Sequence, residues 1–232
     1  MSRILAISDT QAPFQHPDAY HFIHAVDQAF RCDTYVHLGD EVDQHTLSVK
    51  FTPSRRAMSG QDEAEKAMEF MKLLYKRFPL MKVCVSNHTE RYLKKAQMAG
   101  IPDFFLKQIR DAYQAPDGWS WDYMHIIDGI AFMHGMGVGG QYGHIKAMTK
   151  NRRSTVIGHL ANYAGINYLN NFEGELLFGM NGGCLIDVDS YAMEYGRDCL
   201  DKPTIGTPVI INQVPIFVPM KMDKFKRWTG QL

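Results

Sequence analysis

The sequence predicts an α/β protein with two sheets, and three observations support this prediction. Short apolar runs alternate with helical patterns in the first part of the chain, these runs end in polar or glycine residues, and β-rich segments follow one another from Trp119 onward. Strands that alternate with helices are typical of a largely parallel sheet with right-handed crossovers. We expect the later segments to form a second sheet that packs on the first.

Five short runs have the length and composition of strands. They are Ile4 to Ser8, Thr34 to Leu38, Met81 to Ser86, Ile130 to His134, and Ser154 to Gly158. The second half adds the β-rich segments GELLFGM, CLIDVD and TPVIINQVPIFVP.

Two stretches between the early runs carry apolar residues at three- and four-residue steps, which is typical of amphipathic helices. Pro17 to Phe30 is the first, and its proline suits a first helical turn. Glu63 to Phe78 is the second, and Pro79 ends it. The polar region from Glu41 to Gln61 is expected to be a long mobile loop, and such loops often cover a site.

Length and composition indicate a single domain over residues 1–232. The chain has 45% hydrophobic and 22% charged residues, and no stretch approaches the roughly 18 apolar residues of a membrane span. We therefore expect a soluble protein with no membrane partner. The apolar stretch before Asp9 is too short for a signal peptide, which favours the cytoplasm.

The cysteines and the charge exclude some classes of protein. Four cysteines without a CxxC pair favour buried reduced thiols over disulfides or a zinc knuckle. A formal net charge of zero argues against a surface coated in positive charge for a polyanion. The basic stretches Lys146 to Arg153 and Ser54 to Arg56 are either solvated ends of elements or local phosphate contacts, and solvation is the more frequent explanation.

Metal-ligand residue types follow five of the predicted strands. They are Asp9, Asp40, Asn87 with His88, His134, and His159. Any one of them alone has a common structural explanation as a cap or turn residue. Because the carboxyl ends of strands line the crevice of an α/β sheet, we expect all five to converge there. Mixed imidazole, carboxylate and amide ligands suit manganese, iron or zinc.

The order of these motifs resembles the calcineurin-like metallophosphoesterase family, whose pattern is DxH, GDxxD, GNH[DE], H and GHxH. The resemblance extends from Ile4 to about Asn162, and the SDTQAPF and SNHTER stretches also resemble a phage-type subset. It implies a four-layer α/β/β/α fold, in which helices flank a two-sheet sandwich. It also implies two divalent ions, with manganese expected and iron, zinc or nickel as alternatives.

The resemblance implies a ligand set for each ion. The second ion would be held by Asp40, Asn87, His134 and His159. The first would be held by Asp9, the residue at position 11, Asp40, and the second histidine of GHxH. This sequence has Gln11 and Ala161 at the two histidine positions. Glutamine is a weak donor to a transition metal and alanine donates nothing, so we expect one tight and one weakened site. Asn162 could substitute for Ala161 only if the backbone turns there.

The implied activity is hydrolysis of a phosphoester by metal-activated water. His88 matches the family's general acid, and Arg91 is either a phosphate-binding residue or a surface residue. Asp43 is expected to support the site, whereas His45 is expected to face solvent or substrate. Glu90 lies one position later than the family's acidic residue, so its pairing with His88 is in doubt.

Three functions are compatible with these residues. A phosphodiesterase or nuclease acting on DNA or RNA, in a host cytoplasm if the chain is phage-encoded, is the first choice. A phosphomonoesterase or small-nucleotide hydrolase fits the neutral charge better. A catalytically silent metal-binding interaction protein is the third alternative. The sequence leaves the oligomeric state open.

Two aromatic features have a functional and a structural interpretation. Trp119 and Trp121 could stack on a base, but alternating aromatics in a half-buried strand are more common. The basic and aromatic tail from Lys221 to Trp228 could bind a partner, and a capping segment is the simpler interpretation.

Overall fold

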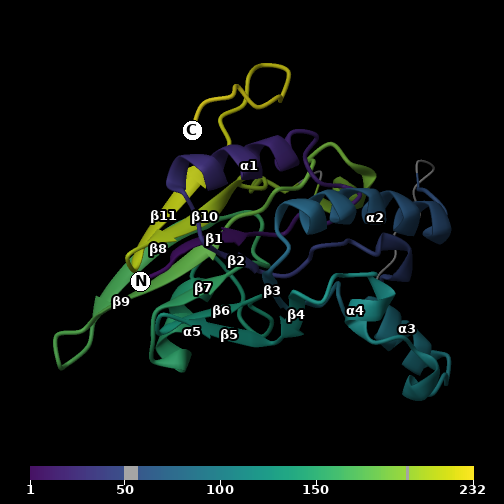
Figure 1. Cartoon of the computed structure of the whole chain (residues 1–232), viewed down its shortest axis with the longest axis horizontal. Coiled ribbons are helices and arrows are strands. Elements are labelled where there is room, and N and C mark those ends of the chain that lie inside the picture. Colours follow the sequence, from purple (N-terminus) through teal and green to yellow (C-terminus); the bar gives the residue numbers. More distant parts are fainter. Residues whose placement is uncertain (50–56, 197–198) are drawn as a thin grey trace.

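The computed structural model describes residues 1–49, 57–196 and 199–232, and within these ranges it has two mixed sheets flanked by helices (Figure 1). From edge to edge, the first sheet consists of β11 (Val214–Pro219), β10 (Gly206–Ile211), β1 (Arg3–Ile7), β2 (Thr34–His37), β3 (Met81–Cys84) and β4 (Trp119–Asp122). The second consists of β5 (Met124–Ile127), β6 (Ile130–Met133), β7 (Thr155–Ile157), β9 (Leu176–Gly182) and β8 (Ala164–Asn170).

The first sheet is parallel from β1 to β4, as the alternation of strands and helices predicts. The crossover helices are α1 (Ala19–Phe30) and α2 (Gly60–Arg77). The second helix begins three residues before its predicted start at Glu63. The reason is an N-cap, since the Ser59 hydroxyl accepts a hydrogen bond from the Asp62 amide at 3.1 Å.

Strand β1 of the first sheet is buried on both faces, and its alternate residues reach different cores. Leu5 and Ile7 of β1 belong to a core shared with α1 and α2. Ile4 and Ala6 of the same strand belong to a core between the sheets, which also contains Phe132 of β6. Because both faces of β1 are buried in apolar cores, its sequence is a continuous apolar run.

Helix α5 (Gly143–Asn151) covers the other side of the second sheet, where it packs on β7 and β9. Gly179 of β9 permits this approach, because a Cβ atom there would lie 2.7 Å from the His144 carbonyl oxygen. The order of layers is therefore helices, first sheet, second sheet and helix, which confirms the predicted fold class. The basic stretch that begins at Lys146 starts on this helix.

The division of the β-rich segments between the sheets was predicted wrongly. Strand β4, which begins at Trp119, joins the first sheet, and the β10–β11 hairpin returns to it. The Trp119 ring is 1% exposed and its indole nitrogen donates to the Phe78 carbonyl at 2.8 Å, which holds β4 beside β3. The hairpin reverses at Asn212 and Gln213, which both have positive φ, as in a type I′ turn.

The CLIDVD segment, Cys184 to Asp189, forms only isolated bridges and no strand among the described residues. Its amide groups bond instead to loops that follow β1. The Leu185 amide donates to the Asp9 carbonyl at 3.1 Å, and the Asp187 amide donates to the Phe14 carbonyl at 2.7 Å. The segment therefore holds the chain that follows β1 in place by these backbone hydrogen bonds.

The predicted loop from Glu41 to Gln61 contains the 3-10 helix η1 (His45–Leu47) and the start of α2. Glu63 of α2 stabilises η1, because its carboxylate accepts from the His45 amide at 2.5 Å and the Thr46 amide at 3.1 Å. Residues 50–56, with the basic stretch Ser54 to Arg56, lie outside the described residues.

Short helices α3 (Arg91–Met98), η2 (Asp103–Phe105) and α4 (Ile109–Ala112) lie between β3 and β4, and η3 (Tyr191–Gly196) precedes β10. Among the helices of the described residues, none is long and apolar enough to cross a membrane.

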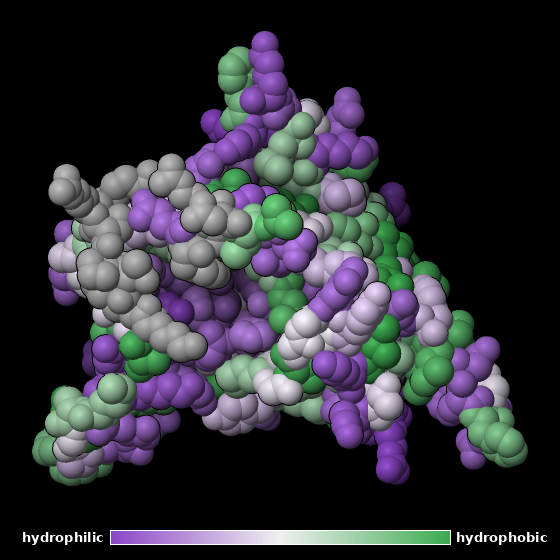
Figure 2. All heavy atoms as spheres, turned by 180° about the vertical axis from the view of Figure 1, so that it is seen from behind, coloured by the Kyte–Doolittle hydropathy of each residue, from purple (hydrophilic) through white to green (hydrophobic). Residues whose placement is uncertain are grey.

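The face seen in Figure 2 is hollowed, and hydrophilic residues line the hollow.

The four cysteines are free. Cys84 and Cys184 are buried as expected, but Cys32 is half-buried and Cys199 is exposed, so the expectation of four buried thiols is wrong for these two. Cys199 lies on a loop beside a cavity, where no core packs over it.

The C-terminal tail packs over α1 (Figure 1). The ring of Trp228 meets Phe22 edge-on at 5.7 Å, and the Arg227 guanidinium pairs with the carboxylate of Asp18. His16 donates to the Lys226 carbonyl at 2.9 Å. These contacts support the interpretation of the tail as a capping segment.

Candidate metal centre

The candidate site lies where strands of both sheets end. Asp9 follows β1, Asp40 follows β2, Asn87 follows β3, His134 follows β6, and His159 follows β7. Asp40, His134 and His159 each offer a ligand atom, and these atoms all lie within 4.8 Å of one another. The strand ends therefore converge as the sequence predicts.

The hydrogen bonds of His134 define which of its nitrogens faces this cluster. Its Nδ1 lies 2.8 Å from the Leu38 carbonyl oxygen and must donate to it. In the neutral ring the Nε2 atom therefore carries a lone pair. Nε2 lies 3.0 Å from Asn87 Oδ1, 3.3 Å from Asp40 Oδ1, and 3.1 Å from His159 Nδ1.

This convergence fits a cation. Oδ1 of Asn87 and Oδ1 of Asp40 are acceptors, and they face the Nε2 lone pair of His134. His159 Nδ1, 3.1 Å from His134 Nε2, can donate a proton to at most one of these three acceptors. Buried acceptors that face one another repel unless a donor or cation lies between them. The residues present thus suit a divalent ion bound by two imidazoles, a carboxylate and an amide oxygen.

Protonation states agree with that arrangement. Burial lowers the pKa of His134 to about 4 and also lowers that of His159, so both rings are neutral at pH 7, the state that binds metals. Burial opposes ionisation of Asp40, but at acid pH, where the imidazoles are charged, attraction from His134 and His88 outweighs it and holds the Asp40 pKa below its ordinary value. The cluster therefore has one carboxylate and two neutral imidazoles.

The backbone at these strand ends is in the left-handed region. The φ angle is 35° at Asp9, 46° at Gln11, 50° at Asp40 and 68° at His159. Residues other than glycine rarely adopt such angles, and they concentrate at functional sites. Gly39 before Asp40 has a φ of 96°, and a Cβ atom there would lie 2.8 Å from His134 Nδ1.

The residues assigned to the first ion are arranged differently. The Asp9 carboxylate accepts from the His159 amide at 2.9 Å, and it approaches His134 on the Nδ1 side, at 3.9 Å. Burial and the charge of Asp40 raise the Asp9 pKa well above its usual value. Gln11 directs its amide nitrogen toward Asp40 Oδ2 at 3.5 Å, so it acts there as a donor.

The position of the missing second histidine lies at the rim of a cavity. Ala161 and Asn162 form a turn between β7 and β8. Asn162 is exposed and lines the cavity beside His159. The backbone does turn here, as a substitution by Asn162 would require, but its side chain faces the cavity.

His88 is held between a cation and a carboxylate. Its Nδ1 lies 2.9 Å from Asp43 Oδ1, and its Nε2 lies 3.6 Å from Asp40 Oδ2. Arg91 donates to His88 Nε2 at 2.7 Å and to the Asp43 carbonyl at 2.5 Å. The side chain of Arg91 is only 18% exposed, so the alternative of a surface residue is wrong.

Two further expectations near His88 are resolved by contacts. Glu90 is directed away, since it pairs with Lys94 at 2.9 Å and accepts from the Tyr123 hydroxyl at 2.5 Å. His45 is 12% exposed at its side chain and packs edge-on against Tyr191. His45 therefore does not face solvent, because aromatic rings cover it, and the alternative that it faces substrate stays a prediction.

Sequence reasoning missed Glu41, which is fully buried directly after Asp40. Its carboxylate accepts from the indole of Trp121 at 3.0 Å and from the Thr89 hydroxyl at 3.3 Å, and burial raises its pKa to about 7. A buried carboxylate so close to the cluster links β4 to the site. The bond from Trp121 to Glu41 favours the structural interpretation of this tryptophan.

One cavity adjoins the cluster, and a second shares lining residues with the first. The inner cavity, of about 410 Å³, is lined by His159, Leu160, Ala161, Asn162, Tyr163, Gly140, Gln141 and Asp201. The outer cavity, of about 670 Å³, also contains Asn162 and Asp201 in its lining. A substrate group at His159 therefore has space beside it.

The sequence matches no family model and no curated protein. Among solved structures, the chain is similar to Vps29 from Chaetomium thermophilum, with a TM-score of 0.49 and 10% identity over 98% of this chain and 92% of that one. It is also similar to Vacuolar Protein Sorting 29 from Cryptosporidium parvum (0.44, 12% identity, 94% and 95%) and to the nuclease MPE from Pseudomonas putida (0.37, 10% identity, 93% and 86%). Likenesses this distant assign no activity to this chain.

Proposed function

We propose that this chain is a metal-dependent phosphoesterase of the calcineurin-like type, which hydrolyses phosphodiester bonds. The observation that carries the proposal is the meeting of the His134 Nε2 lone pair with Asp40 Oδ1 and Asn87 Oδ1, three acceptors to which the neighbouring His159 ring can supply at most one proton. His159 completes the donor set. When bound, a divalent ion supplies Lewis-acid polarisation of the phosphoryl group and neutralises its charge.

His88 is the proposed general acid. Water forms the new P–O bond and loses a proton to solvent as the P–O bond to the leaving group breaks, and the Nε2 proton of His88 passes to the departing oxygen. Asp43 beside Nδ1 stabilises the protonated ring before that transfer. Arg91 donates a hydrogen bond to His88 Nε2 in this structure. In this proposal its guanidinium moves to a phosphate oxygen of the substrate, which leaves Nε2 free to carry the proton.

Two substitutions separate binding from chemistry. Asp40→Asn should abolish both metal content and hydrolysis, because the amide removes the only carboxylate of the cluster. His88→Asn should keep the metal and slow turnover by roughly 10²- to 10⁴-fold, which is the usual contribution of a general acid. Metal per chain is measured by mass spectrometry. The effect of His88→Asn is measured with an unactivated dialkyl phosphodiester, whose alkoxide leaving group needs the proton, and ester preference is measured with bis(p-nitrophenyl) phosphate and p-nitrophenyl phosphate.

The same assay distinguishes the proposed phosphodiesterase from the two competing functions. Cleavage of the monoester alone would identify a phosphomonoesterase. If the manganese-loaded protein cleaves neither ester, the chain is a silent metal-binding protein and the proposal fails.

A further inference from the structure

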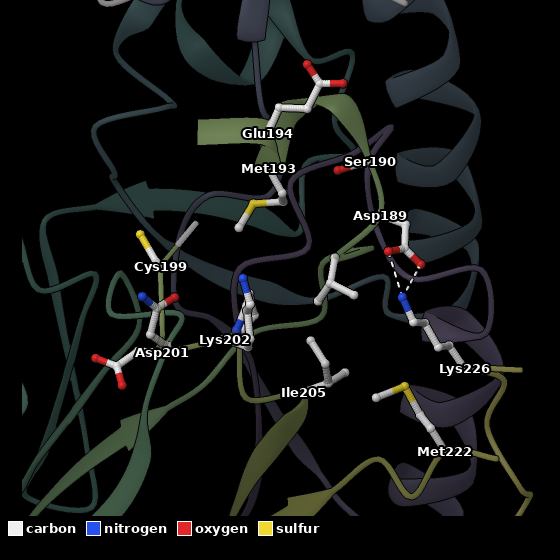
Figure 3. A pocket seen from close by; sticks show the side chains of 13 residues that line it. Asp189, Ser190, Met193, Glu194, Cys199, Asp201, Lys202, Ile205, Met222 and Lys226 are labelled. Atoms are coloured by element: carbon white, nitrogen blue, oxygen red, sulfur yellow. Dashed lines mark hydrogen bonds and ion pairs between the residues drawn. The ribbon is translucent and has the colours of Figure 1, made fainter. Parts of the chain in front are cut away.

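The two cavities share part of their lining. The inner cavity is lined by His159, a member of the cluster, and by Asn162 and Asp201. These last two residues also line the outer cavity, shown in Figure 3. The part of a substrate that extends from a phosphate at the cluster along Asn162 and Asp201 would therefore reach the outer cavity.

The outer cavity has an apolar wall and a polar rim. Its apolar lining consists of Val188, Met193, Pro203, Ile205 and Met222. Its polar lining includes Asn162 and Ser190, and the tail closes one side, where Lys226 bonds to Asp189 at 2.6 and 2.7 Å. The volume of about 670 Å³ lies within the range of roughly 300 to 1,000 Å³ that is typical of small-molecule sites.

The charge of the outer cavity opposes a polyanion. Among the described lining residues, the carboxylates are Asp189, Glu194 and Asp201, and the ammonium groups are Lys202 and Lys226. The lining thus has one net negative charge. In the inner cavity, Asp201 adds a carboxylate with no lysine or arginine in the described lining. A groove for nucleic acid needs a basic track along the phosphates.

We infer that the substrate is a small phosphodiester, one of whose two organic groups is uncharged and of nucleoside size, and that the outer cavity binds this group. The inference rests on the proposed function and names its substrate class. One phosphate lies at the cluster, and the organic group lies against the methionines of the outer cavity. A polynucleotide would place a second phosphate against carboxylates.

Cys199 provides a binding test that needs no turnover. It lines the outer cavity and is exposed, whereas Cys84 and Cys184 are buried. The full chain carries Cys32→Ser, to remove the half-buried thiol, and His88→Asn, to prevent hydrolysis. Alkylation of Cys199 is followed in the manganese-loaded protein in the presence of one of three added ligands: thymidine 5′-monophosphate, inorganic phosphate, or an oligothymidylate of ten nucleotides.

Saturating thymidine monophosphate should slow alkylation at least tenfold. Phosphate alone should not slow it, because phosphate fills only the cluster. Equal protection by phosphate, better protection by the oligonucleotide, or no protection by the mononucleotide would each overturn the inference. Met222→Trp, which fills part of the cavity, should abolish protection, whereas Met98→Trp on the exposed end of α3 should preserve it.

The two proposals fail in different ways. Protection of Cys199 without hydrolysis of any ester contradicts the enzyme and keeps the binding site. Hydrolysis of the generic esters without protection of Cys199 keeps the enzyme and removes the binding site.

Discussion

At the scale of single residues, the site depends on backbone angles that most side chains avoid. Asp9, Asp40 and His159 all leave their strands in the left-handed region. The Asp9 and Asp40 carboxylates thereby reach residues that follow strands of the second sheet, namely the His159 amide and the His134 ring. Gly39 permits the turn at Asp40, because backbone and ring atoms occupy the space where a Cβ atom would lie.

Gly39→Ala should therefore destabilise the protein by roughly 3 kcal/mol or more, from backbone strain and a forced clash together. The added Cβ would lie 2.7 Å from the Cys84 carbonyl oxygen and 2.8 Å from His134 Nδ1. Gly100→Ala is a matched control, because Gly100 has a φ of 72° with no atom within 4 Å of an added Cβ. Its cost should be about 1 kcal/mol, from strain alone. Urea unfolding measures both, and equal losses would contradict the role of the close approach.

A substitution at position 161 tests the prediction that the first ion site is weakened. Ala161→His restores an imidazole at the rim of the inner cavity, two residues after His159. We expect it to add a second ion per chain, because imidazole is a far better donor to manganese or zinc than a methyl group. Metal content after equilibrium dialysis gives the answer. Unchanged content in this variant, while His134→Ala still lowers it, would show that position 161 does not face an ion.

At the scale of elements, the tail and the loop after Asp187 are tied together at the end of α1. Asp18 precedes α1 and accepts bonds from Arg227 and from the Trp228 amide. Lys226 of the same tail bonds to Asp189 at the rim of the outer cavity. The tail therefore links the first helix to the cavity wall, which explains why basic and aromatic residues occur together there.

The pairing of Asp18 should make stability depend on pH. The hydrogen bonds from Arg227 lower the pKa of Asp18 to about 2, from an ordinary value of 3.8. The ionised carboxylate therefore stabilises the folded state above about pH 4, and this contribution disappears as the pH falls toward 2. Since the Arg227 side chain is 57% exposed, the effect should be about 1 kcal/mol or less.

Asp18→Asn isolates this contribution. The variant should unfold at lower urea than the parent at pH 6, and the difference should vanish near pH 2. Comparison of the two proteins at each pH cancels the titration of all other groups. A difference that stays constant over this range would contradict the role of the Asp18 charge.

At the scale of the whole molecule, charge separates the possible substrates. The chain has no formal net charge, and the outer cavity beside the cluster is slightly acidic. A protein that neutralises six to ten phosphates loses roughly 10³- to 10⁵-fold in affinity between 50 and 200 mM salt. For a small phosphoester, we expect KM to change less than about threefold over that range. Steep salt dependence would favour the nuclease.

The two sheets bring distant parts of the chain to one point. The first sheet supplies Asp9, Asp40 and Asn87, and the second supplies His134 and His159. The apolar core between the sheets, with Leu38 and Phe132, sets the distance between these groups. A cavity in that core would therefore be expected to disturb ion binding as well as stability.

The sequence by itself determined the elements and the residue types at their ends. Apolar periodicity marks the early strands and α1, and Asp9, Asp40, Asn87, His134 and His159 directly follow such strands, because both features are written in neighbouring residues. The departures Gln11 and Ala161 are likewise visible without a structure.

The tertiary structure alone decided which atoms meet. The burial of Trp119 places β4 in the first sheet, the Leu38 carbonyl selects the nitrogen with which His134 faces the cluster, and Arg91 lies on His88. The burial of Glu41 and the presence of the outer cavity were also decided by the tertiary structure alone. The physical reason is that contacts between residues far apart in the chain depend on how the packed layers align, and no local pattern encodes that alignment.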